Sequence, residues 1–211
     1  RGLGDVYKRQ VAGETAISTV GMEGTSLRYR GYDAIELTKN STYEAVASLV
    51  INDSLDEADY KKSFSKYYLQ IGKDKNLNQL LEEVKEKLSP MDVIRTVVSY
   101  MGELTTLMKK KLDNQDKVEL TARINATVCY IIASYHKDDC DELDDSYLVA
   151  SSMLPNNANK EKIEALDDML ILYAEHGFNA STFAARVTAS TRSDLTSAIV
   201  SGIGTLKGEL H

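Results

Sequence analysis

Three histidines are the side chains of this sequence with the most adaptable chemistry near neutral pH, because imidazole can donate, accept or exchange a proton there. His211 ends the sequence and follows Gly202, Gly204 and Gly208. This glycine spacing misses the dinucleotide-binding fingerprint by one residue and follows a predicted helix rather than a strand, so it does not indicate a Rossmann turn. The glycines instead favour close helix packing and a sharp turn. Since no nucleophile elbow or phosphate-binding loop is present either, spacing alone identifies no reaction.

His176 is predicted to close a long helix that begins at Lys160. A histidine is favoured there because its cationic form meets the negative end of the helix dipole, so a structural role is the first interpretation. Glu175 is a possible base, but neighbours on a helix point in different directions, and the two residues do not form a dyad. Gly177 supplies the left-handed conformation that often ends a helix. The side chains expected to face the core along this helix are Ile163, Leu166, Leu170 and Tyr173.

His136 lies between the two cysteines, Cys129 and Cys140. A structural zinc site needs four ligands, usually in closely spaced pairs. Because the spacing here is wrong and the surroundings are rich in Asp and Lys, we expect no metal site and interpret His136 as part of a solvated helix end.

Size and charge restrict the class of protein. A chain of 211 residues can bury one sizeable core, and its formal charge of −7 disfavours nucleic acid and anionic membranes as partners. Anionic substrates remain possible because they respond to the local field of a cleft. No apolar run reaches the ~18 residues that a membrane span needs. Two cysteines in a chain of this size fit a reducing, cytoplasmic location better than a disulfide framework.

The pattern of apolar residues predicts an all-α, multi-helical domain with a small N-terminal β-hairpin. Six of the 12 glycines fall in the first 31 residues. Residues 14–20 and 26–30 form two extended runs around Gly21 and Gly24, and Leu27 and Tyr29 alternate with arginines as in a strand with one covered face.

Helical patterns follow the hairpin, and local signals mark several of their starts. Ser41 and Glu44 have the spacing of a capping box, and Ser89 with Pro90 predicts another helix start. The apolar spacing predicts further helices over residues 60–72, 77–88, 124–135, 160–176, 181–190 and 194–206.

Several blocks, in order, resemble the citrate synthase family. They are the stretches Val11–Ser18 (VAGETAIS), Leu27–Asp33 (LRYRGYD), Ser89–Ser99 (SPMDVIRTVVS), Leu170–His176 (LILYAEH) with Asn179–Phe183 (NASTF) and Ala185–Val187, and Ala198–Ile199 with Gly204 and Leu206–Gly208 leading to His211.

The resemblance implies the large helical domain of a two-domain enzyme that condenses an acyl-CoA with a 2-oxo acid. It implies that His211 is catalytic, hydrogen-bonding the thioester oxygen and stabilising the enol. It implies that His176 holds oxaloacetate, with Asn179 as its neighbour, which reverses the structural interpretation of His176. Acetyl-CoA is the expected acyl donor, and propionyl-CoA, used by 2-methylcitrate synthases, is the alternative. The resemblance also implies a homodimer and no permanently bound cofactor.

Departures from the family pattern define the expected limits of the chain. Residues 1–10 have no counterpart, so they are expected to be an extension, and residues 11–211 a partial large domain truncated at its C-terminus. Gly177 and Glu209 stand where the family often has an acidic residue and a proline. The family's general-base Asp, second catalytic His and substrate-clamping Arg residues lie beyond His211, so this chain is expected not to turn over alone. A non-catalytic helical protein that dimerises through its apolar helices is the alternative of another class.

Overall fold

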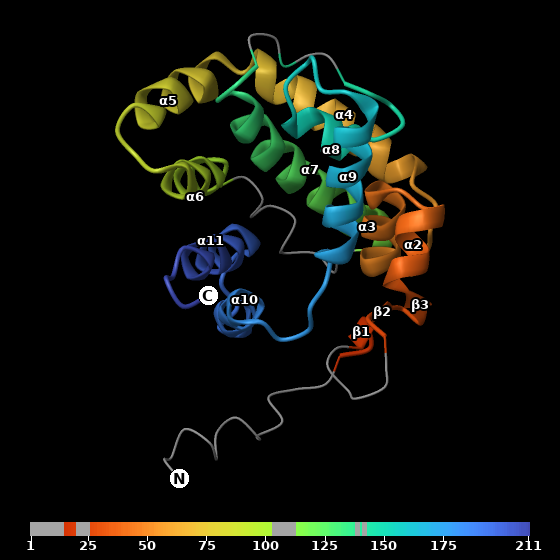
Figure 1. Cartoon of the computed structure of the whole chain (residues 1–211). Coiled ribbons are helices and arrows are strands. Elements are labelled where there is room, and N and C mark those ends of the chain that lie inside the picture. The colour runs from red at the N-terminus through yellow and green to blue at the C-terminus, as the bar shows by residue number, and fades with distance from the viewer. Residues whose placement is uncertain (1–14, 20–25, 103–112, 138–139, 141–142) are drawn as a thin grey trace.

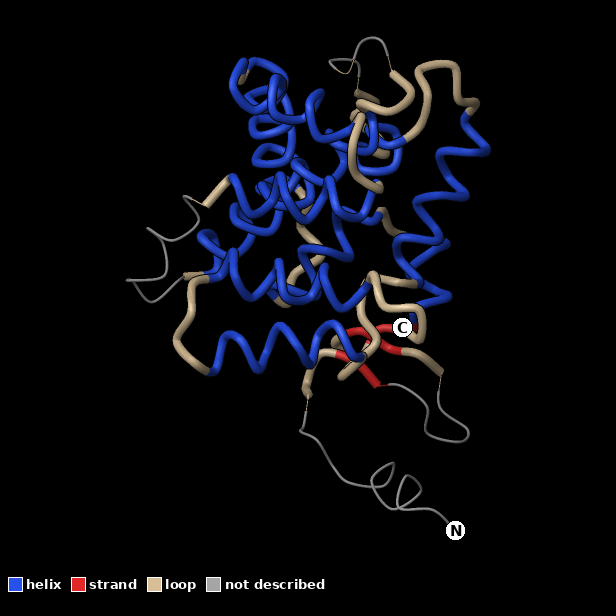
Figure 2. Tube along the Cα trace, turned by 90° about the vertical axis from the view of Figure 1, so that its left-hand side faces the viewer, coloured by secondary structure: helices blue, strands red, loops and turns tan. Residues whose placement is uncertain are grey.

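A computed structural model describes residues 15–19, 26–102, 113–137, 140 and 143–211. These residues form a helical body with a small sheet at one edge (Figures 1 and 2). The elements are β1 (Ser18–Thr19), β2 (Arg28–Tyr29), β3 (Tyr32–Asp33), α2 (Ala34–Asn40), α3 (Tyr43–Asn52), α4 (Ala58–Lys73), α5 (Lys75–Lys85), α6 (Pro90–Tyr100), α7 (Asn114–Ala133), α8 (Leu148–Met153), α9 (Lys160–Leu172), α10 (Ala180–Ser190) and α11 (Leu195–Leu206). The predicted all-α class with a small N-terminal hairpin is confirmed.

The sheet extends the predicted hairpin by one strand. β1 pairs antiparallel with β2, and β2 with β3, in the register Tyr29 opposite Tyr32. Arg30 and Gly31 form the two-residue turn between β2 and β3, and both have positive φ, at 50° and 90°. This is the conformation that matches the twist of a tight hairpin, and Gly31 adopts it without steric cost. Gly21 and Gly24 lie outside the described residues.

Aromatic side chains of α4 form the centre of the main core. Tyr60, Phe64 and Tyr68 are fully buried and stack in sequence along one face, and Tyr130 of α7 meets Tyr68 edge-on at 5.4 Å between ring centroids. The polar ends are satisfied as well, because Asn125 donates to the Tyr60 hydroxyl at 2.6 Å. α4 and α7 thus pack face to face (Figure 1). No helix among the described residues is both long and apolar enough to cross a membrane.

A second, smaller core joins the sheet to α2, α3 and α9. Its buried members are Tyr29, Ala34, Leu37, Val46, Leu49 and Ile171. This cluster determines where α9 ends relative to the sheet, and therefore where the connection from α9 to α10 begins.

The predicted capping box at the start of α3 is wrong in its partners. Thr42, rather than Ser41, is the cap, and its hydroxyl accepts a hydrogen bond from the Ala45 amide at 3.3 Å. Glu44 turns into the interior instead, where its carboxylate accepts from the amide of Val149 at 2.7 Å. The predicted start of α3 is therefore correct to within one residue, while the Glu44 carboxylate accepts a hydrogen bond from α8 instead of completing a capping box.

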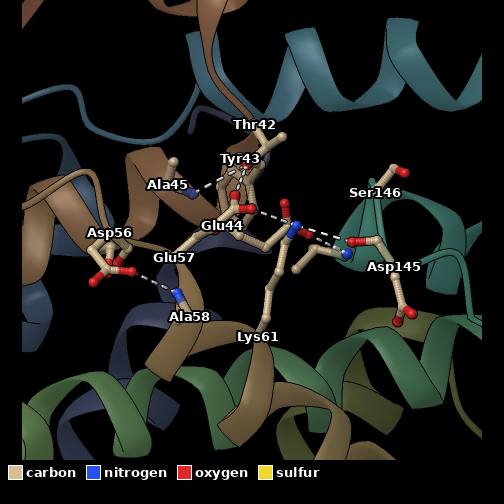
Figure 3. Close-up of polar contacts among 12 residues, drawn as sticks. Thr42, Tyr43, Glu44, Ala45, Asp56, Glu57, Ala58, Lys61, Asp145 and Ser146 are labelled. Atoms are coloured by element: carbon tan, nitrogen blue, oxygen red, sulfur yellow. Dashed lines mark hydrogen bonds and ion pairs between the residues drawn. The ribbon is translucent and has the colours of Figure 1, made fainter.

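Two buried carboxylates each satisfy the start of a neighbouring helix. Asp167 of α9 accepts from the amide of Tyr43, the first residue of α3, at 3.2 and 3.1 Å to its two oxygens. Glu44 of α3 does the same for α8 through Val149. Figure 3 shows the polar surroundings of Glu44, in which Lys61 pairs with Glu57 at 2.6 Å. Burial raises the pKa of Glu44, and burial together with the nearby Glu44 raises the pKa of Asp167 to about 7.

The predicted inward face of α9 is correct only in part, and these contacts explain why. The buried residues of α9 are Asp167 and Ile171, whereas Tyr173 is 82% exposed. Ile163, Leu166 and Leu170 are partly buried. The buried face of α9 therefore includes a carboxylate, which an apolar periodicity does not register.

Candidate functional site

His176 lies in the connection between α9 and α10 rather than at a helix end. α9 ends at Leu172, where the carbonyl oxygen accepts a hydrogen bond from the Tyr29 hydroxyl at 3.0 Å. The prediction that His176 closes the helix is therefore wrong, and its side chain is exposed. Gly177, at φ 69°, supplies the left-handed conformation that was predicted for it, here within the connection.

The carboxylate of Glu175 holds this connection in shape. Its Oε1 accepts from the Gly177 amide at 2.6 Å and from the Ser18 hydroxyl at 3.1 Å. His176 thus sits between a residue tied to β1 and a glycine tied back to that same carboxylate. The sequence offers no signal for the contact with Ser18, which is 157 residues away.

Asn179 forms the N-cap of α10. Its Oδ1 accepts from the Thr182 amide at 2.8 Å and from the Ser181 hydroxyl at 2.7 Å. Because the oxygen is engaged in capping, the side-chain amide nitrogen is the group suited to meet an oxygen of a ligand. The positive end of the α10 dipole also favours a negatively charged group at this position.

His211 is brought to the same end of the α10–α11 pair as Asn179. α10 and α11 pack along each other (Figure 1). Gly202 near the end of α11 faces Ser181 at the start of α10. The two helices therefore run antiparallel, and the segment after α11 returns to the beginning of α10. The His211 amide donates to the Gly208 carbonyl at 3.0 Å, and the His211 side chain is exposed. No hydrogen bond among the described residues joins His211 to His176.

The start of α6 anchors the segment that carries His211. Lys207 reaches the Asp92 carboxylate at 2.5 Å, and Ser89 and Arg95 bind the same carboxylate at 2.7 and 2.8 Å. The Lys207 hydrogen bond is the main reason that the pKa of Asp92 lies below its usual range. This anchor was not predicted, although the Ser-x-x-Asp spacing at a helix start could have identified Asp92 as a local hydrogen-bond partner.

The cysteines and His136 do not form a site. Cys129 is buried in the main core, where burial raises the pKa of its thiol to about 12, while His136 is exposed. Within the described ranges no group of three or more His, Cys, Asp or Glu side chains could hold a metal ion. The candidate site therefore consists of His176, Asn179 and His211 with their supports.

The close approach at Gly202 gives a test of how the two helices are held together. A methyl group at Gly202 would lie 3.4 Å from the Ser181 carbonyl oxygen and 3.6 Å from Ala185 Cβ, which are tight but ordinary contacts. We expect Gly202→Ala to fold with nearly unchanged stability. Gly202→Val should force the helices apart and lower the free energy of unfolding by about 1–3 kcal/mol. Urea denaturation of both variants measures this, and equal midpoints would contradict the close packing of α10 on α11.

Comparisons with known proteins agree with this arrangement. The family described as "Citrate synthase, C-terminal domain" matches residues 6–211. The chain is 38% identical over 213 residues to a 2-methylcitrate synthase of Shewanella oneidensis and 33% identical over 213 residues to a citrate synthase of Haloferax volcanii. These matches cover 96% and 94% of this chain but only 56% and 55% of the relatives, so the chain spans about half of their length.

Solved structures show the same fold. The citrate synthase of Pyrobaculum aerophilum superimposes with a TM-score of 0.74 at 27% identity over 95% of this chain and 54% of that one. A ternary complex of carboxymethyl coenzyme A and oxaloacetate with the citrate synthase of Thermoplasma acidophilum gives a TM-score of 0.81 at 23% identity, over 100% of this chain and 57% of that one.

Proposed function

Because the chain belongs to the citrate synthase family, we propose that its protein condenses acetyl-CoA with oxaloacetate to give citrate and free CoA. The observation that carries the proposal is the return of the segment with His211 to the start of α10, beside the connection that holds His176 and Asn179. Relatives named citrate synthase and the Thermoplasma complex with oxaloacetate support the choice of substrates.

Each site residue has a role that its position permits. His211 donates a hydrogen bond to the thioester oxygen, where negative charge develops as the enol forms. His176 and the side-chain amide of Asn179 bind oxygens of oxaloacetate, whose carboxylates also meet the positive end of α10. The reaction needs no permanently bound cofactor, since the acyl-CoA is itself a substrate.

Propionyl-CoA as the acyl donor is the second candidate. The relatives that are 38% and 36% identical to this chain are named 2-methylcitrate synthases. An identity of 33% to a citrate synthase is too close to these values to decide between the donors. Donor choice therefore has to be measured directly.

The same resemblance supports proposals about the whole protein. Residues 11–211 are proposed to belong to the large helical domain, with residues 1–10 as an extension, and the protein is proposed to be a cytoplasmic homodimer. The presence of only two cysteines, Cys129 and Cys140, supports a reducing compartment. Large apolar side chains exposed on α9–α11 support a further protein surface packed against them, and they include Met169, Phe183, Val187 and Leu206.

The test is to sequence the gene past the codon for His211 and to assay both this chain and the complete product. Thiol release is followed with oxaloacetate plus acetyl-CoA, and separately plus propionyl-CoA. We expect turnover by the complete product, and the donor with the higher kcat/KM identifies the substrate. A complete product that is silent with both donors would favour a non-catalytic helical protein that dimerises.

A further inference from the structure

We propose that Glu175 is a positioning residue, which fixes the connection carrying His176 by tying it to the N-terminal sheet. The inference rests on the proposed role of His176 in holding the 2-oxo acid. It adds a residue and a segment, β1, that lie outside the three candidate site residues.

The first support is that one oxygen of Glu175 organises both sides of His176. Glu175 Oε1 accepts from the Gly177 amide at 2.6 Å, which closes the backbone around His176 into a tight bend. The same oxygen accepts from the Ser18 hydroxyl at 3.1 Å, which attaches this bend to β1. Glu175 and Ser18 are both partly buried, so water competes weakly for the contact.

The second support is that the sheet itself is firmly attached, so it can serve as a fixed point. Tyr29 of β2 is fully buried and its hydroxyl binds the Leu172 carbonyl at 3.0 Å, at the other end of the connection. The Arg30 side chain donates to the Val50 carbonyl of α3 at 3.1 Å. The connection from Leu172 to Gly177 is therefore tied to the sheet at both ends, and Figure 1 shows the sheet beyond the end of α9.

The third support is the chemistry of the carboxylate. A negative charge beside a site for a dicarboxylate repels the substrate, so direct contact between Glu175 and oxaloacetate would be unfavourable. In the structure Glu175 Oε1 instead accepts from two donors of the protein, the Gly177 amide and the Ser18 hydroxyl. Glutamine carries the same oxygen without the charge, so Glu175→Gln can preserve both hydrogen bonds while Glu175→Ala removes them.

Steady-state kinetics of the complete gene product separates positioning from general damage. We expect Glu175→Ala to raise KM for oxaloacetate by about tenfold or more, because a displaced histidine loses its substrate contact, with KM for the acyl-CoA within about twofold. Ser18→Ala should raise KM for oxaloacetate by about two- to fivefold, which is the loss of one neutral hydrogen bond. Glu175→Gln should remain within about twofold of the wild type. Thr19→Ala, on the exposed neighbour in β1, is the matched control and should change nothing.

Hydrogen–deuterium exchange of peptides spanning Gly177 provides a readout that does not depend on turnover. Exchange at this amide should accelerate in Glu175→Ala and stay slow in Glu175→Gln. We call the two hydrogen bonds of Glu175, to the Gly177 amide and the Ser18 hydroxyl, the brace. Unchanged exchange in the alanine variant would overturn the proposal that the brace fixes this connection. A glutamine variant whose KM for oxaloacetate rises as much as that of the alanine variant would overturn it as well. A wild-type enzyme that is silent with oxaloacetate but shows the expected exchange would instead overturn the proposed function and, with it, the role of this brace in catalysis.

Discussion

Replacing His211 by Ala in the complete gene product is expected to lower kcat for thiol release by about 10²–10³-fold, the usual effect of removing one donor to a developing oxyanion. The His211 side chain is exposed and contributes nothing to either core, so its removal should leave the melting temperature unchanged. We therefore expect kcat to fall while the melting temperature stays the same. Release of CoA, followed with a thiol reagent under saturating oxaloacetate, measures it.

His136→Ala is the matched control, since His136 is also an exposed histidine but lies beyond the end of α7. We expect that variant to keep the full rate. A His211→Ala enzyme that is as fast as the control would exclude a catalytic role for His211, even if the family assignment stands.

The largest effect on stability is expected from Asp167→Asn. The pKa of Asp167 is raised from 3.8 to about 7, so the folded protein holds a proton that the unfolded chain has released between these values. Its contribution to stability is present below about pH 4 and is lost as pH rises through 7. A shift of this size corresponds to about 2–4 kcal/mol lost across that window. Asparagine can still accept from the Tyr43 amide without carrying a charge, so the variant should be more stable than the wild type at pH 8.

Urea unfolding at intervals from pH 5 to pH 8 tests this expectation. The wild type should lose stability relative to Asp167→Asn as pH rises to about 7, so the difference between the two should be smallest at the acidic end. Asp168→Asn is the control, because Asp168 is the exposed neighbour of Asp167 on α9 and its charge is only a lesser cause of the raised pKa of Asp167, so this variant should keep most of the wild-type pH dependence. Parallel curves for wild type and Asp167→Asn would mean that Asp167 is ionised in the fold at every pH tested.

Helix starts were the part of the fold most accessible from the sequence, because their signals are local. Pro90 begins α6 and Lys160 begins α9 as predicted, and Asp194 precedes α11 as its cap. Each of these starts depends on side chains within a few residues of the amides that they satisfy. The predicted role of Gly202 in helix packing agrees with its contacts, although these lie on the preceding helix, at Ser181 and Ala185.

The errors share a different cause, which is that the decisive partner is distant in the sequence. The spacing of Ser41 and Glu44 predicts a capping box, but the Glu44 carboxylate accepts instead from the amide of Val149, 105 residues later. The sequence predicts the end of α9 at His176 because nothing local reveals that Tyr29 binds the Leu172 carbonyl. For the proposed site, resemblance alone is the basis for His176, Asn179 and His211, while the contacts of Glu175 and Asp92 required the structure.

The bond between Ser18 and Glu175 has a consequence for how the protein is made. The two residues are 157 positions apart, so during synthesis the N-terminal segment emerges long before its partner exists. At about 5–20 residues per second, the ribosome leaves that segment without its partner for roughly 8–30 s. Contacts of such high sequence separation also form slowly because a long loop must close first. The brace on the His176 connection is therefore expected to be among the last parts of the protein to form, so binding competence should follow the appearance of helical structure with a measurable delay.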